Sequence, residues 1–379
     1  MNQYKILLST SILLFIASGI LYALALTNYV GFSVAAAFLL LSIAVKHTNN
    51  YKGFSFTLVI FSAVSLSLFQ PQLFTVWGGY KLTGLIVPLI QLIMFGMGTS
   101  MSMKDFALVV KTPKGVIIGV VSQFAIMPTL GFLLASISNL PPEIAAGVIL
   151  IGCSPSGLAS NVMSYLAKAN LALSITITSI TTLIAPFVTP LLMKLFAGEL
   201  VEIDVTKMMW DINKMILLPI GAGLIFNQFL KGKLKWMDSA MPIVSMAGIA
   251  AIITIITASG RDNLLTIGPI LIGIVLIHNT LGYLLGYWSG KLFKMPEQDC
   301  RTIAIEVGMQ NGGLASGLAQ QLGKAATMGL APAVFGPFMN ITGSILASYW
   351  HKREPKTNAY LVELNNTVLF KFMKAFYNR

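Results

Sequence analysis

Charge is scarce in this sequence: only 10% of its 379 residues are Asp, Glu, Lys or Arg, and 56% are hydrophobic. Soluble globular domains carry about 25% charged residues. Apolar runs of about 20 residues recur along the chain, and each is long enough to cross about 30 Å of hydrocarbon. Helices on a soluble core would instead show one polar face each. The composition therefore excludes an ordinary soluble protein and predicts an all-α integral membrane protein.

Histidine and cysteine are also rare, which excludes several kinds of site. The three histidines, His47, His278 and His351, are far apart and make no zinc motif. Cys153 and Cys300 give no disulfide framework, and we expect both to be buried as small apolar residues. The sequence also lacks a nucleophile elbow, a phosphate loop and a dinucleotide fingerprint. We therefore expect neither an enzyme nor an ATP-driven pump within this chain.

The net charge of +12 comes from basic residues that gather in alternate loops. This set is Lys46, Lys52, Lys104, Lys111, Lys114, Lys168, Lys231, Lys233, Lys235, Lys291, Lys294, Arg301, Lys352, Arg353 and Lys356. Such a distribution follows the positive-inside rule and predicts that these loops and both termini are cytoplasmic. The basic charge thus indicates topology and a lipid bilayer partner in a cell inner or plasma membrane, and not nucleic acid.

The apolar runs predict about twelve spans. Two come first, at 5–26 and 31–46, and a block of ten follows, at 53–70, 82–101, 112–137, 141–166, 170–197, 207–229, 238–258, 265–292, 298–322 and 329–350. Ala23-Leu24-Ala25 is similar to a signal-peptide cleavage site, but the apolar stretch before it is long for a signal. We therefore favour a retained first helix.

The ten-helix block divides into two fives. An odd number of spans per half inserts the halves with opposite orientation, as in inverted-repeat transporters. The fourth span of each half is interrupted by helix breakers with polar neighbours, at 152–161 and 306–313. Matching breaks in the two halves predict a binding site. Kinked packing helices are the alternative, since Gly and Ser are common at transmembrane interfaces.

Glu306 is the carboxylate placed most clearly within a membrane span. A charge at that depth is costly unless it is paired, and no Lys or Arg lies within four residues of it in sequence. A bound cation is the simplest partner, and a protonated structural glutamate is the alternative.

Oxygen-bearing residues accompany Glu306, as hard cations require. Gln310 and Asn311 follow it at one break, and Ser160 and Asn161 lie at the other. Three further residues come from neighbouring spans: Ser174 and Thr178, which share a helix face, and the lone amide Gln123. Together they predict two oxygen cages bridged by Glu306.

Three long motifs make the chain resemble the bile acid:sodium symporter family, its bacterial members above all. They are 94–98 (MFGMG), 152–168 (GCSPSGLASNVMSYLAK) and 305–311 (IEVGMQN). The resemblance covers residues 53–350 and implies a symporter domain there, with panel helices at 53–101 and 207–258. The core helices would be at 112–197 and 265–350. Residues 1–52 would add two helices, and 351–379 a basic cytoplasmic tail that is either an amphipathic surface helix or disordered.

The resemblance also implies two sodium sites. The first would use Ser160, Asn161, Ser174, Thr178 and Glu306, and the second Gln123, Glu306, Val307, Met309 and Gln310. The substrate would meet residues at both breaks and on the last helix: Pro155, Ser156, Gly157, Leu158, Asn311, Gly312 and Asn340. The N–H groups near Gly157 and Gly312 would face a carboxylate.

The first break departs from the family pattern Gly-Cys-Cys-Pro-Gly-Gly-Thr, because it holds Ser154, Ser156 and Leu158. An isobutyl group at Leu158 replaces a hydroxyl, so we expect an altered substrate pocket. The leading hypothesis is sodium-driven symport of a small organic anion by alternating access. A sodium/proton antiporter and a membrane sensor that binds ligand without moving it are the alternatives. The sequence leaves the substrate and the oligomeric state open.

Overall fold

The structure is a computed structural model, and it describes residues 3–46, 54–100, 113–230 and 235–353. Eight of the described helices are long and apolar enough to cross a membrane. The β-structure in this part of the chain is one antiparallel pair of two-residue strands, β1 (Val76–Trp77) and β2 (Tyr80–Lys81), and one isolated bridge. The all-α membrane class is therefore confirmed.

The first part of the chain is a series of helices. They are α1 (Gln3–Ala23), α2 (Thr27–Lys46), α3 (Ser55–Phe69), α4 (Ile86–Ser100), α7 (Pro113–Ile137), α8 (Pro142–Cys153), α9 (Ala159–Leu166) and α10 (Leu171–Ala197), with two short 3-10 turns, η2 (Pro71–Phe74) and η3 (Leu82–Leu85), around the strands. Local signals set several of these boundaries. Proline opens α7 and α8, where its missing N–H has no helical acceptor. The Asn170 side chain caps α10 by accepting from the N–H of Leu173.

The second part continues the same pattern. Its helices are α11 (Val205–Ile212), the π-helical turn η4 (Asn213–Leu217), α12 (Leu218–Leu230), α13 (Lys235–Ser259), α14 (Arg261–Leu292), α15 (Glu297–Gly308), α16 (Gly312–Gln321) and α17 (Leu330–His351). With α8/α9, α11/α12 and α15/α16 each taken as one span, these helices match the spans predicted from the sequence to within a few residues. Within the basic tail predicted at 351–379, residues 354–379 lie outside the described part.

Two spans are interrupted near their middle. The first interruption lies between α8 and α9, where Ser154 precedes Pro155 and adopts an extended backbone (φ −79°, ψ 153°). A residue before proline is driven away from helical geometry, so the sequence ends α8 at this point. The second follows Gly308, where Met309 is also extended (φ −107°, ψ 104°). The predicted helix breaks are therefore present in both halves.

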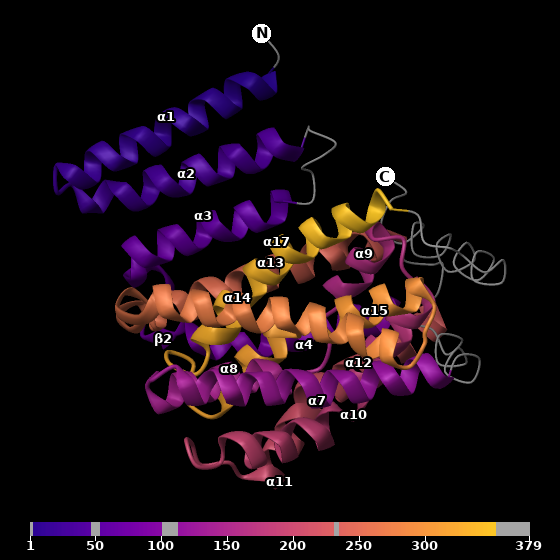
Figure 1. Cartoon of the computed structure of the whole chain (residues 1–379). Coiled ribbons are helices and arrows are strands. Elements are labelled where there is room, and N and C mark those ends of the chain that lie inside the picture. Colours follow the sequence, from indigo (N-terminus) through magenta and orange to yellow (C-terminus); the bar gives the residue numbers. More distant parts are fainter. Residues whose placement is uncertain (1–2, 47–53, 101–112, 231–234, 354–379) are drawn as a thin grey trace.

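The first three helices lie side by side at one edge of the molecule, with α1 outermost and α3 against the rest (Figure 1). The hydroxyl of Ser11 in α1 donates to the carbonyl of Ala37 in α2. On the other side, α3 packs against α13. The broken spans lie deeper, between α7, α10, α14 and α17.

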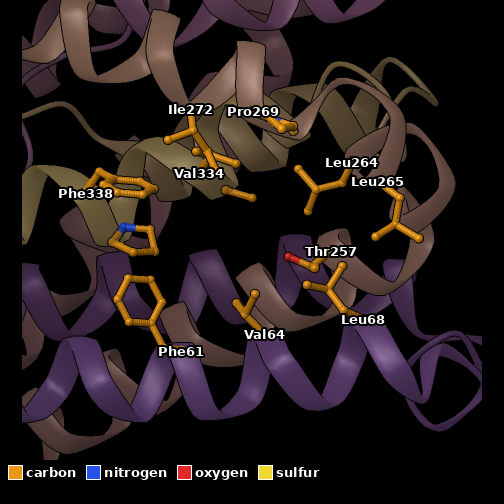
Figure 2. Close-up of a pocket in the computed structure, with 13 residues that line it drawn as sticks. Phe61, Val64, Leu68, Thr257, Leu264, Leu265, Pro269, Ile272, Val334 and Phe338 are labelled. Atoms are coloured by element: carbon orange, nitrogen blue, oxygen red, sulfur yellow. The ribbon is translucent and has the colours of Figure 1, made fainter. Parts of the chain in front are cut away.

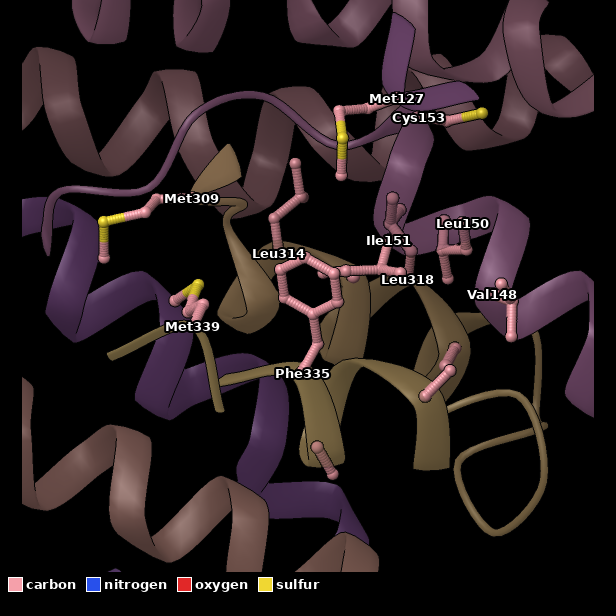
Figure 3. Packing of buried hydrophobic residues seen from close by; sticks show 14 of the residues in the cluster. Met127, Val148, Leu150, Ile151, Cys153, Met309, Leu314, Leu318, Phe335 and Met339 are labelled. Carbon is pink, nitrogen blue, oxygen red and sulfur yellow. The ribbon is translucent and has the colours of Figure 1, made fainter. Parts of the chain in front are cut away.

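The apolar core surrounds the broken spans. Phe335 of α17 is fully buried, and Figure 3 shows its ring among Ile151 of α8 and Leu314 and Leu318 of α16. Cys153 and Cys300 are both buried and unpaired, as expected from the sequence. The core thus holds the two breaks against each other.

Candidate functional site

The two helix breaks meet and pair through their backbones. The N–H of Gly157 donates to the carbonyl of Met309 at 2.8 Å, and the N–H of Asn311 donates to the carbonyl of Pro155 at 2.8 Å. Ser156 and Gln310 between them form an antiparallel bridge. A Cβ on Gly157 would lie 2.6 Å from the Gln310 carbonyl oxygen, so glycine is required for this approach.

Five side chains gather on one side of this crossing, and they are the five predicted for the first sodium site. The carboxylate of Glu306 is fully buried and accepts from three hydroxyls. Ser160 and Ser174 lie 2.6 Å and 2.5 Å from Oε1, and Thr178 lies 2.7 Å from Oε2. The Asn161 Oδ1 lies 2.9 Å from the Ser174 hydroxyl. These residues come from α9, α10 and α15 and form one cluster.

The cluster has more acceptor oxygens than hydroxyl hydrogens. The single hydroxyl hydrogen of Ser174 faces both Glu306 Oε1 and Asn161 Oδ1. None of the ion pairs in the described part of the chain includes Glu306. A buried carboxylate without a basic partner is unfavourable, so a cation is the natural complement. The set offers only carboxylate, amide and hydroxyl oxygens, which suit a hard cation such as sodium.

A second polar group forms around the side chains of Gln123 and Gln310. The Nε2 of Gln123 donates to Gln310 Oε1 at 2.7 Å and to the Ser154 carbonyl at 2.9 Å. The Nε2 of Gln310 donates to the Val307 carbonyl at 2.6 Å. The structure therefore brings Gln123, Gln310 and Val307 together, as predicted for the second site.

Two members of that predicted second site are engaged elsewhere. The carbonyl of Met309 accepts from Gly157. The carboxylate of Glu306 contacts the first cluster, while its backbone carbonyl accepts from the Ser156 hydroxyl at 3.0 Å. In this arrangement the amide groups of the second set form hydrogen bonds with each other and are not arranged around one cation position.

The residues predicted to meet a substrate divide into two groups. Pro155, Ser156 and Asn311 pair within the crossing. Leu158 is 36% exposed beside the break, and Asn340 is partly buried on α17, where its amide donates to the Gly336 carbonyl. Leu158 is thus the most exposed side chain among these residues, and Asn340 is partly accessible.

The expectation of free N–H groups near Gly157 and Gly312 does not hold at these two glycines themselves. The N–H groups of Gly157 and Gly312 are not free for a carboxylate, because they donate to the carbonyls of Met309 and Gln310 at 2.8 Å and 3.0 Å. The two breaks satisfy these donors by pairing with each other and by a tight turn. A Cβ on the adjacent Gly313 would meet only the Asn311 side chain, at 3.4 Å, so backbone is accessible one residue further on.

Sequence reasoning did not predict a polar network that supports the end of α15. Asn279 donates to the Gly308 carbonyl at 2.7 Å, and its Oδ1 accepts from the Thr342 hydroxyl at 2.5 Å. The Tyr283 hydroxyl donates to the Met339 carbonyl at 3.1 Å. Asn279 is fully buried within a span, and a buried amide within a span was the signal that could have identified it.

Comparison with known proteins places this architecture among sodium-linked carriers. The family model described as "Sodium Bile acid symporter family" matches residues 87–267. The chain is 43% identical over 318 residues to the uncharacterized sodium-dependent transporter YocS of Bacillus subtilis, covering 83% of this chain and 96% of that protein. It is 32% identical over 293 residues to the probable sodium/metabolite cotransporter BASS1, chloroplastic, of Arabidopsis thaliana, covering 77% of this chain and 72% of that protein.

Proposed function

The chain belongs to the sodium bile acid symporter family of sodium-coupled membrane transporters, and from this premise we propose that it moves a small organic anion together with sodium by alternating access. Relatives named as sodium/metabolite cotransporters support a small-molecule substrate. We place the chain in a cell inner or plasma membrane with both termini cytoplasmic, because its basic residues gather in alternate loops.

The observation that carries the proposal is the buried carboxylate of Glu306 among the hydroxyls of Ser160, Ser174 and Thr178. A sodium ion there would join α9, α10 and α15 and neutralise the carboxylate. We assign a second ion to the group around Gln123, Gln310 and the Val307 carbonyl. Sodium binding would then exchange amide–amide hydrogen bonds for ion contacts and tighten the crossing of the two breaks.

The substrate would lie beside this crossing, near Leu158 and Gly313. Gly157 and Gly312 use their N–H groups within the crossing. The protein surface that meets the substrate would therefore depend both on bound sodium and on the pairing of the breaks. Coupling of this kind is reciprocal: sodium should raise substrate affinity by the factor by which substrate raises sodium affinity.

The proposed moving parts are two groups of helices. The panel would contain α3, α4, α11/α12 and α13, and the core would contain α7, α8/α9, α10, α14, α15/α16 and α17. Movement of the panel relative to the core would expose the crossing to one side of the membrane and then the other. We assign no transport role to α1 and α2.

The test combines a binding screen with a flux assay. Purified protein is screened for thermal stabilisation by a panel of carboxylates, each with and without sodium, and compounds that stabilise are then tested for uptake into proteoliposomes. We expect uptake with an inward sodium gradient and none with potassium. Sodium-driven proton efflux without any solute uptake would instead support an antiporter, and the absence of substrate counterflow would support a sensor.

A further inference from the structure

We propose that a second site, separate from the helix crossing, holds one acyl chain of a membrane phospholipid whose anionic headgroup lies against Arg261. A cavity of about 420 Å³ lies between α3, α13, α14 and α17. Figure 2 shows its lining, with Phe61, Val64 and Leu68 on one side and Leu264, Ile272 and Phe338 on the other. Its volume lies in the range of small-molecule sites.

The lining suits hydrocarbon and not a polar solute. Besides apolar side chains, it contains the hydroxyl of one threonine, Thr257, which is 3% exposed. Such a surface cannot orient a carboxylate, because orientation needs placed polar groups. A carboxylate metabolite would therefore not be selected here, whereas an acyl chain would be.

The cavity borders an exposed apolar surface of α14. Leu265 contributes to its lining and is 57% exposed, and Pro269 is exposed one turn further along. Ile277 and Leu284 on the same helix are also exposed and apolar, as expected of a surface in contact with lipid. An acyl chain can therefore enter sideways from the bilayer.

A cation lies at one end of this cavity. Arg261 is the first residue of α14, and its Nε donates to the Leu68 carbonyl at the end of α3 at 2.5 Å. Its Nη1 pairs with the Asp262 carboxylate at 2.9 Å, and the Arg261 side chain remains 35% exposed. A guanidinium has five N–H donors, so further donors remain for a phosphate.

The surroundings of Arg261 also fit a headgroup. The β1–β2 hairpin follows the same end of α3 and exposes Trp77 and Tyr80. Exposed Trp and Tyr side chains are typical of the headgroup level of a bilayer. The cavity, the cation and the aromatic pair thus match the acyl chain, phosphate and interface of one lipid molecule.

The lipid would bridge the two proposed moving groups, because α3 and α13 line the cavity from one group and α14 and α17 from the other. It would therefore influence the rate of panel movement. This consequence rests on the proposed transport function, whereas the binding itself does not.

The test uses a phosphatidylglycerol that carries a diazirine at the end of one acyl chain. The full-length protein is reconstituted with this lipid, irradiated and mapped by peptide mass spectrometry. Gly268→Leu is designed to fill the cavity: a Cβ there meets Leu264 at 3.6 Å, an ordinary contact. Gly273→Leu is the matched control on the same helix, where a Cβ meets nothing within 4 Å and the residue lies outside the lining. Thermal unfolding checks that both variants fold.

We expect labelling at Phe61, Ile272 and Phe338, at the end of the cavity away from Arg261, reduced about tenfold or more by Gly268→Leu and unchanged by Gly273→Leu. Loss of a charge-assisted hydrogen bond lowers binding affinity by about tenfold or more. Arg261→Gln should therefore lower labelling by phosphatidylglycerol by that factor relative to an equally labelled phosphatidylcholine. Equal labelling in both glycine variants would show that the label reports ordinary surrounding lipid and would overturn the proposal. Displacement of the label by sodium plus a transported carboxylate would also overturn it. Labelling is read without uptake, so a failure of the transport proposal leaves this result interpretable.

Discussion

Replacing Glu306 with glutamine tests the centre of the proposed sodium site. The substitution keeps the shape of the side chain and removes its charge. Ser160 and Ser174 can still donate to the remaining carbonyl oxygen, but Thr178 would face the amide NH₂ in place of Oε2 if that oxygen becomes the nitrogen. We expect Glu306→Gln to fold and to lose most of its sodium affinity.

The size of the effect follows from the burial of the carboxylate. Removing one partner of a buried ion pair costs about 3–5 kcal/mol, so sodium affinity should fall by about two to nearly four orders of magnitude. At a sodium concentration about 100 times the wild-type dissociation constant, the wild type gains about 2.7 kcal/mol of stability. A variant that binds about 100-fold more weakly would gain about 0.4 kcal/mol under the same conditions.

The assay is thermal unfolding of purified protein during a titration from potassium to sodium at constant ionic strength. Glu202→Gln is the control, because Glu202 is exposed in the loop before α11. Asn161→Ala should weaken sodium binding by about tenfold, since it removes one neutral oxygen. Without sodium, Glu306→Gln should be at least as stable as the wild type, because it no longer buries an unpaired charge. If Glu306→Gln keeps the wild-type sodium response, Glu306 is a structural carboxyl and the site assignment is wrong.

Three other substitutions probe the crossing, the substrate surface and one end of the core. Gly157→Ala should abolish sodium-dependent uptake, because its Cβ would lie 2.6 Å from the opposite carbonyl oxygen. Gly221→Ala is the control and should leave uptake intact, because its Cβ would meet nothing within 4 Å. Normal uptake by Gly157→Ala would refute the close approach of the two breaks. Leu158→Thr should change the order of preference in competition uptake across carboxylates and leave sodium affinity unchanged, and an unchanged order would show that Leu158 does not meet the substrate. Arg301→Gln should lower the free energy of unfolding by about 2–4 kcal/mol, because its 4%-exposed guanidinium donates to a carboxylate and two backbone carbonyls. Lys324→Gln, at a more exposed ion pair, should cost about 1 kcal/mol or less in the same thermal unfolding experiment. Equal costs would contradict the role of burial.

The sequence alone determined the spans, the breaks and the central carboxylate. Hydrocarbon forces backbone groups to bond within a helix, so apolar runs translate directly into helices. Pro155 forces Ser154 into an extended conformation, so the first break was readable locally. Glu306 was identifiable because a carboxylate at membrane depth needs a partner. These features depend on a residue and its immediate neighbours.

Only the tertiary structure decided which groups meet. The hydroxyls of Ser160 and Ser174 reach Glu306 across sequence separations of 146 and 132 residues, and helical periodicity cannot fix such contacts. The N–H group of Gly157 donates across the pairing of the two breaks and that of Gly312 donates within a tight turn, whereas the sequence had suggested that N–H groups near both glycines were free. The cavity beside Arg261 likewise exists only because helices distant in sequence pack with a gap between them. Local chemistry sets what each residue can bind, and packing sets whether its partners are within reach.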